Sequence, residues 1–256
     1  MNAIKFLLLT GLLLTASAAC AEKILIAAAA DLKFALDEIA AEFRQDHPDD
    51  TIEIVYGSSG KFFTQIQQDA PYDLYFSADI GFPKQLAQDD FAASEVKPYA
   101  VGRIVLWSAT LDASMLTLEN LTDSSIKRIA IANPKHAPYG KRAEEALRST
   151  GIWAAVEPKL VYGENIAHTA QFVQTGNAQT GIIALSLALN PELSKQGGHY
   201  LIPDTLHEPL EQGYIITRRA ANNVLAKNFA EFIASPQARN VMTRYGFILP
   251  DQIGNP

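Results

Sequence analysis

Four short turns in this chain place hydroxyl, amide, carboxyl or glycine groups directly before a helical pattern. They are Ala30-Asp31, Ser58-Ser59, Pro138-Tyr139-Gly140 and Asn165-Ile166, and each follows a short apolar segment or a loop that ends one. The first turn of a helix has unpaired backbone N–H groups and a partial positive charge, so it can hold an anion. Four such turns facing one cleft would form a largely uncharged anion site. The alternative is that each turn only caps its own helix.

The Ser58-Ser59 turn is the clearest of the four. Segment 51–56 is a predicted strand that runs into it, and a helical pattern follows. We predict that Ser59 is the N-cap of that helix. Gly57 and Gly60 flank the serines, and we expect them to let a ligand approach the backbone.

The elements that position these turns alternate between strand and helix. Segments 24–30, 51–56 and 71–79 are predicted strands. The nearly continuous apolar run 24–30 is typical of a strand buried on both faces of a parallel sheet. Asp31 follows it and is a candidate N-cap for the next helix. This spacing predicts a doubly wound α/β unit.

A second unit of the same kind begins near residue 102, and the chain then returns to the first unit near Gly213–Thr217. We therefore predict an α/β fold of two doubly wound lobes joined by two crossing strands. Lobe 1 comprises residues 22–101 and 215–256, and lobe 2 comprises residues 102–214. Ligands bind outside the carboxyl ends of the strands in such sheets, so the two lobes should face each other across a cleft that closes by hinge motion.

Residues 1–21 are predicted to be a secretory signal peptide. Lys5 precedes the apolar run 6–14, and Ala19-Cys20-Ala21 forms a small-residue cleavage site. The apolar run is too short to span a membrane. The alternative is a lipid anchor on Cys20, which Ser17 disfavours because a lipoprotein signal usually carries Leu there. Cleavage would leave a chain without cysteine, which suits an oxidising compartment.

Charge and motif content exclude several classes of function. The net charge is −7, and it becomes −8 when Lys5 leaves with the signal peptide, which disfavours nucleic acid and anionic membranes as partners. The sequence has no G-x-S-x-G elbow, no Walker A motif and no zinc-type spacing of His and Cys. His136 and His168 are isolated. An enzyme on a related two-lobed scaffold stays open as an alternative, because a fold does not fix a function.

Four segments resemble the periplasmic molybdate-binding proteins of ABC transporters. They are residues 23–32, 56–60, 73–79 and 164–166, and the resemblance covers essentially the whole mature chain. It implies a type II periplasmic binding protein fold, a periplasmic location and a membrane permease as partner. It also implies molybdate or tungstate as the ligand, with molybdenum present only as bound molybdate. No cofactor and no chemical step are implied, and a monomer is expected.

The resemblance further implies which residues bind the oxyanion. Ser59 would bind through its hydroxyl and its backbone N–H, and Ile166 through its backbone N–H. The family places a ligand tyrosine at one of two positions. Ala184 occupies the first of these and Tyr139 the second, so this chain resembles the branch that uses Tyr139.

The first turn departs from the family pattern, which usually has Ser or Asn at the position of Asp31. A carboxylate about 4 Å from a dianion would repel it by several kcal/mol at an effective dielectric constant of about 20. We therefore predict that the Asp31 carboxylate turns back onto its own helix N-terminus and leaves its backbone N–H for the ligand. Ala30 and Ser58 are less central candidates in the same turns. Lys61 and Lys141 lie close enough in sequence to offset the charge of Asp31.

Other oxyanions stay open as ligands at this stage. Sulfate shares the charge and shape of molybdate, so only the size of the cavity separates the two strongly. Phosphate usually carries one proton and needs a hydrogen-bond acceptor, which Asp31 could supply.

Overall fold

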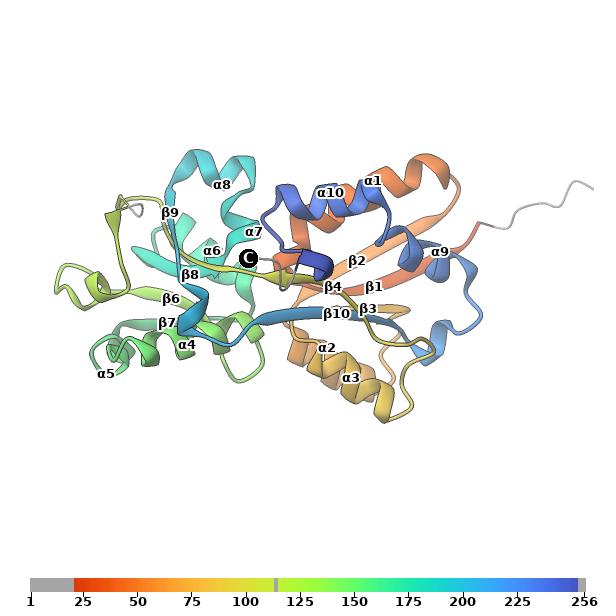
Figure 1. Ribbon diagram of the computed structural model, residues 1–256, viewed down its shortest axis with the longest axis horizontal. Coiled ribbons are helices and arrows are strands. Elements are labelled where there is room, and N and C mark those ends of the chain that lie inside the picture. Colours follow the sequence, from red (N-terminus) through yellow and green to blue (C-terminus); the bar gives the residue numbers. More distant parts are fainter. Residues whose placement is uncertain (1–20, 113–114, 253–256) are drawn as a thin grey trace, which may run out of the picture.

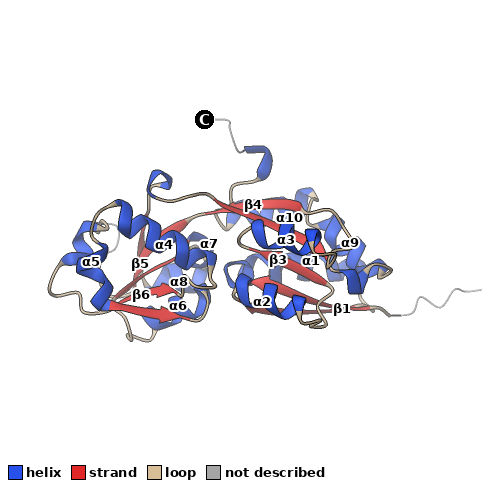
Figure 2. Cartoon of the chain, turned by 90° about the horizontal axis from the view of Figure 1, so that it is seen from below, coloured by secondary structure: helices blue, strands red, loops and turns tan. Residues whose placement is uncertain are grey.

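The computed structural model describes residues 21–112 and 115–252, so the predicted signal peptide lies outside the described residues apart from Ala21. Two α/β lobes lie side by side, and each consists of helices packed around one sheet (Figure 1). The same two bodies are seen after a turn of 90° in Figure 2. Over the described ranges, no helix is both long enough and apolar enough to cross a membrane.

The sheet of lobe 1 has five strands in the order β2-β1-β3-β10-β4. Strand β1 pairs in parallel with β2 and β3, and β10 runs antiparallel to both β3 and β4. The strands are β1 (Lys23–Ala29), β2 (Thr51–Gly57), β3 (Leu74–Ser77), β4 (Lys97–Gly102) and β10 (Leu210–Ile216). The helices are η1 (Ala30–Leu32), α1 (Lys33–Asp46), α2 (Ser59–Gln67), α3 (Gly81–Gln88), η6 (Arg218–Ala220), α9 (Val224–Phe232), α10 (Pro236–Arg244) and η7 (Pro250–Gln252).

The sheet of lobe 2 repeats this topology in the order β7-β6-β8-β5-β9. Three parallel strands are again followed by one that runs antiparallel to its neighbours. The strands are β5 (Ile104–Ser108), β6 (Ile129–Ala132), β7 (Leu160–Gly163), β8 (Thr180–Ala184) and β9 (Gly198–Leu201). The helices are η3 (Glu119–Thr122), α4 (Pro138–Ser149), α5 (Trp153–Val156), η4 (Glu157–Lys159), α6 (Ile166–Gln174), α7 (Leu185–Ala188), α8 (Pro191–Gln196) and η5 (Asp204–Leu206).

The chain crosses between the lobes twice. The first crossing joins β4 to β5 through Arg103. Strand β10 pairs with the first sheet along its whole length, from Leu210 beside Gly102 to Ile216 beside Leu74. We therefore propose that residues 210–214 belong to lobe 1 and that the second crossing precedes them, whereas the sequence-based boundary placed them in lobe 2.

The two lobes are in contact where strands end and helices begin. The buried core of lobe 2 extends to Ala29, Ala30 and Ala78 of lobe 1. Small side chains at these three positions allow the backbone turns of the two lobes to approach each other closely. The carboxyl ends of β1 and β3 therefore meet the second lobe, as expected for a ligand site in open α/β sheets.

Two predicted helix starts differ from the structure by a residue or more. Ser58 is the N-cap of α2, and Ser59 is its first helical residue. Helix α4 begins at Pro138, so the turn Pro138-Tyr139-Gly140 is part of the helix and does not precede it, since proline fits the first turn, where its missing N–H has no partner to lose. Both shifts place the backbone of these turns inside a helix terminus.

Candidate functional site

All six predicted site residues line one buried cavity between the lobes. Its volume is about 10 Å³, which is close to the space that one water molecule needs. The lining residues come from both lobes and are Ala29, Ala30, Asp31, Gly57, Ser58, Ser59, Ala78, Ala137, Pro138, Tyr139, Asn165 and Ile166. The four turns singled out in the sequence therefore converge on a single point.

Two helix N-termini supply unpaired donors to this cavity. Ser59 and Ile166 are the first residues of α2 and α6, so their backbone N–H groups have no partner within their own helices. No other protein acceptor reaches either N–H within the described parts of the chain. Asn165 caps α6 by accepting a hydrogen bond from the N–H of His168, so the cap itself leaves the N–H of Ile166 free.

The Ser59 hydroxyl is held in place with its hydrogen still available. Its Oγ accepts a hydrogen bond from the N–H of Ala78 at 3.0 Å. The Tyr75 hydroxyl donates to the backbone carbonyl of Ser59 at 2.8 Å. Ser59 is 1% exposed, so a ligand that accepts its O–H would do so in a site with little competing water.

Ser58 and Gly60 serve the contact between the lobes. The Ser58 hydroxyl donates to the carbonyl oxygen of His136 at 2.5 Å, and its Oγ lies 2.9 Å from His136 Nδ1. The N–H of Gly60 donates to the same carbonyl at 3.0 Å. A Cβ atom on Gly60 would lie only 2.6 Å from that oxygen. Gly60 therefore makes room for the backbone of lobe 2, and not for a ligand as its sequence position suggested.

The Asp31 carboxylate is not turned away from the second lobe, so that part of the capping prediction is wrong, although the backbone N–H groups of Asp31 and Leu32 at its own helix terminus do lower its pKa. Asp31 lies inside the short helix η1, and α1 has no side-chain cap. Instead Oδ2 accepts hydrogen bonds from the Tyr139 hydroxyl at 3.0 Å and from Gln212 Nε2 at 2.9 Å. Tyr139 belongs to lobe 2, so this contact also joins the lobes. The carboxylate faces the second lobe because one of its donors, Tyr139, lines the cavity from there.

Burial dominates the electrostatics of Asp31. The side chain is 1% exposed, and its Oδ1 has no hydrogen-bond partner among the described residues. Burial raises the pKa of Asp31 from 3.8 to about 6, although hydrogen bonds from Gln212 and Tyr139 and the backbone N–H groups of Asp31 and Leu32 pull it down. The cost of holding a charge away from water therefore exceeds what these four donors return.

Sequence reasoning missed the polar residues that surround Asp31. Gln212 on β10 is fully buried, donates to Asp31 and to the Tyr139 hydroxyl, and accepts from the Tyr99 hydroxyl at 2.6 Å. The Ser186 hydroxyl donates to the Asp31 carbonyl at 2.7 Å. Burial, followed by the charge of Asp31, holds the pKa of Tyr99 and of Tyr139 well above the usual range, so both remain donors.

The two nearby lysines do not offset the charge of Asp31. Lys61 forms an ion pair with Glu164 of lobe 2, and both side chains of this pair are about half exposed. Neither Lys61 nor Lys141 lines the cavity. The Lys61–Glu164 pair instead joins the lobes at the rim of the site, where solvent screens it and its contribution is small.

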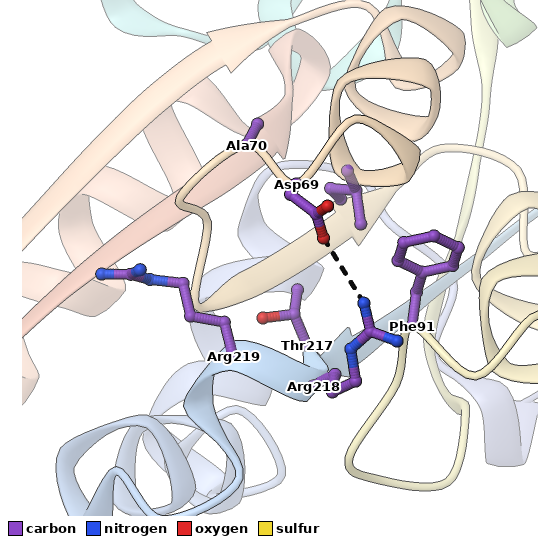
Figure 3. A pocket seen from close by; sticks show the side chains of 7 residues that line it. Asp69, Ala70, Phe91, Thr217, Arg218 and Arg219 are labelled. Carbon is purple, nitrogen blue, oxygen red and sulfur yellow. Dashed lines mark hydrogen bonds and ion pairs between the residues drawn. The ribbon is translucent and has the colours of Figure 1, made fainter.

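A larger surface pocket of about 240 Å³ lies in lobe 1 and shares no residue with this cavity. Arg218 and Arg219 line it (Figure 3). The Arg218 guanidinium lies 3.4 Å from a carboxylate oxygen of Asp69 and stacks over the Phe91 ring. Since this exposed cation is already engaged, the interlobe cavity is the better anion site.

Two lobes of the same topology enclose a cavity that helix N-termini line. This arrangement defines the class of two-lobed ligand-binding proteins. The chain belongs to the family of bacterial extracellular solute-binding proteins, whose model matches residues 24–248. It is 33% identical to the molybdate-binding protein ModA of Rhodobacter capsulatus, with 90% of each chain covered. It is 34% identical to ModA of Azotobacter vinelandii, with 91% of this chain and 93% of that protein covered.

The fold is also found in a solved structure of a relative. The periplasmic molybdate-binding protein of Azotobacter vinelandii superposes with a TM-score of 0.83 at 28% identity, covering 89% of this chain and 99% of that one. The type II periplasmic binding protein fold expected from the sequence is thereby confirmed.

Proposed function

We propose that this protein captures molybdate or tungstate between its lobes and delivers it to an ABC permease. The observation that carries the proposal is the convergence of the free N–H groups of Ser59 and Ile166 with the Ser59 hydroxyl in one buried cavity. Such donors bind an oxyanion without a countercharge. Relatives named molybdate-binding proteins along nine-tenths of the chain support this choice of ligand.

The same proposal assigns roles to the remaining residues of the cavity. Tyr139 donates its hydroxyl to the ligand from lobe 2, and the backbone N–H groups of Ala30 and Asp31 donate from lobe 1. Ser58 supports closure through its contact with His136. Binding consists of lobe closure around the anion, with no covalent step and no cofactor. We place the protein in the periplasm as a monomer, after removal of residues 1–21.

Access to the cavity requires the lobes to separate, because most of its lining residues are buried and its volume is small. Separation breaks the contacts of Ser58 and Gly60 with His136, and the contact of Asp31 with Tyr139. The bonds to His136 are of ordinary net strength, about 0.5–1.5 kcal/mol each, and a bond to an ionised carboxylate contributes about 1.5–3 kcal/mol. Opening by hinge motion about the two crossing strands therefore costs a few kcal/mol in these contacts.

Phosphate is the second candidate ligand, and one observation favours it. The unpartnered Oδ1 of Asp31 could accept the proton that phosphate carries near neutral pH. Calorimetric titration of the mature chain, residues 22–256, with molybdate, tungstate, sulfate and phosphate distinguishes between the candidate ligands. Tight binding of molybdate and tungstate alone supports the proposal. Binding of phosphate alone, or of none of the four anions, overturns it.

A further inference from the structure

The carboxylate of Asp31 is an unusual group for the wall of an oxyanion site. It lines the interlobe cavity and is 1% exposed. Both of its donors, Tyr139 and Gln212, bind the same oxygen, Oδ2. The other oxygen, Oδ1, is buried and has no hydrogen-bond partner in residues 21–112 and 115–252. An unpaired lone pair in such a place is the natural position for a proton.

Among the residues that the structure describes, no basic side chain is hydrogen-bonded or ion-paired to this carboxylate. The titratable side chains that interact with it are Tyr139 on α4 and Tyr99 on β4, and both stay protonated because their pKa values are raised well above the usual range. The other elements packed against η1 carry Lys33 on α1, Tyr56 on β2 and His168 on α6 among their ionisable groups. Lys33 forms an ion pair with Asp37. Within the described residues, none of these is hydrogen-bonded to Asp31.

We propose that binding of a fully ionised oxyanion at this site is coupled to the uptake of one proton by Asp31. The inference rests on the proposed function and adds a determinant of ligand selection to it. The proton comes from solvent and binds Oδ1, and the neutral carboxylic acid then donates its O–H to an oxygen of the anion. Oδ2 continues to accept from Gln212, so no buried donor loses its partner.

The relative size of two effects favours protonation. With a pKa of about 6, about one Asp31 in ten is protonated at pH 7. The need to protonate the other nine-tenths lowers the affinity for the anion about tenfold. An ionised carboxylate about 4 Å from a dianion lowers it on the order of a millionfold at an effective dielectric constant of about 20. Binding with proton uptake therefore costs much less affinity than binding beside an ionised carboxylate.

The protonation state of Asp31 thereby decides which anion fits. The neutral acid is a donor, and it suits molybdate, tungstate or sulfate. The carboxylate is an acceptor, and it suits an anion that brings its own proton, such as hydrogen phosphate. The same cavity would thus bind the two kinds of anion with opposite dependence on pH.

The test is calorimetry of the mature chain with molybdate in two buffers of different ionisation enthalpy, repeated from about pH 6 to about pH 8. Molybdate remains a dianion in this range. We expect uptake of about 0.9 proton at about pH 7, and a Kd that rises about fiftyfold from pH 6 to pH 8, from a pKa of about 6 in the free protein. Asp31→Asn keeps an acceptor for Tyr139 and Gln212 but cannot titrate.

The variants separate the possible outcomes. In Asp31→Asn we expect no proton uptake and a Kd that changes less than about threefold over the range, while Asp37→Asn, outside the cavity, should follow the parent protein. Tight molybdate binding to the parent without proton uptake overturns the inference and leaves the proposed function standing. Failure of molybdate to bind the parent and both variants at every pH overturns the proposed function, and the inference with it.

Discussion

Replacing Asp31 by Asn is expected to stabilise the folded protein at neutral pH. The side chain is buried, Oδ1 has no partner, and its pKa rises from 3.8 to about 6 on folding. The folded state therefore binds this proton more tightly than the unfolded state does. The ionised group then destabilises the fold by about 3 kcal/mol, at about 1.4 kcal/mol for each of roughly two pH units. Asparagine has the same shape and no charge.

The sign of this effect fixes its pH dependence. Between about pH 4 and about pH 6 the folded state holds more protons than the unfolded state, so stability contributed by this group falls as pH rises. Above about pH 6 the full penalty is present, and below about pH 4 it is absent. The gain from Asp31→Asn should follow the same curve.

Urea unfolding of the parent and Asp31→Asn at about pH 7.5 and about pH 4 measures this gain. We expect the variant to be more stable by about 2–3 kcal/mol at the higher pH, or roughly 4–12 °C in Tm, and by less than about 1 kcal/mol at the lower pH. The lower bound allows for the new amide N–H₂ group, which must find acceptors where Oδ1 stood. Asp37→Asn, on the half-exposed face of α1, should show no comparable gain. A variant that is equally or less stable at pH 7.5 refutes the reasoning.

Three other substitutions test separate parts of the site by calorimetry with molybdate. Ser59→Ala removes a hydroxyl that accepts from Ala78 and can donate to the ligand, so Kd should rise about 10- to 100-fold; an unchanged Kd would show that the hydroxyl does not bind. Gly60→Ala puts a methyl carbon 2.6 Å from the His136 carbonyl oxygen, which hinders closure of the lobes. Kd should rise at least about tenfold, while Tm without ligand stays within a few degrees. Unimpaired binding would contradict closure through this contact. Tyr139→Phe removes a donor to Asp31, so it should raise the pKa of Asp31 in an NMR titration and raise Kd about tenfold; a lower pKa would contradict the network.

The strands and turns that build the site were predictable because their signals are local. The apolar run before Ala30 predicted a buried strand, and β1 indeed pairs with a strand on each side. The four turns were found because strand-to-helix connections carry small and capping residues within a few positions. The chemistry of the cavity wall was therefore visible before the lobes were placed.

The orientation of Asp31 was not predictable from local rules. Capping depends on residues about three positions away, whereas the donors to Asp31, Tyr139 and Gln212, lie 108 and 181 positions along the chain. Gln212 did leave a signal. In β10 it lies two positions from Leu210 and two from Tyr214, so the three side chains share one buried face. A buried side-chain amide is unusual unless it has a hydrogen-bond partner. The sequence offers no means of naming that partner.

The role of Gly60 was missed for the same reason. A glycine beside a helix N-cap predicts close approach of something to the backbone. The approaching group is the His136 carbonyl of the other lobe, and only the packed structure can distinguish it from a ligand.

The most direct test of oxyanion capture between the lobes is a crystal structure of the mature protein with molybdate, in which anomalous scattering locates the molybdenum. We expect one strong peak in the interlobe cavity, with oxygens within about 3 Å of the backbone nitrogens of Ser59 and Ile166 and of the Ser59 hydroxyl. A peak at the Arg218 and Arg219 pocket of lobe 1, or none between the lobes, would contradict the assignment of this cavity as the binding site.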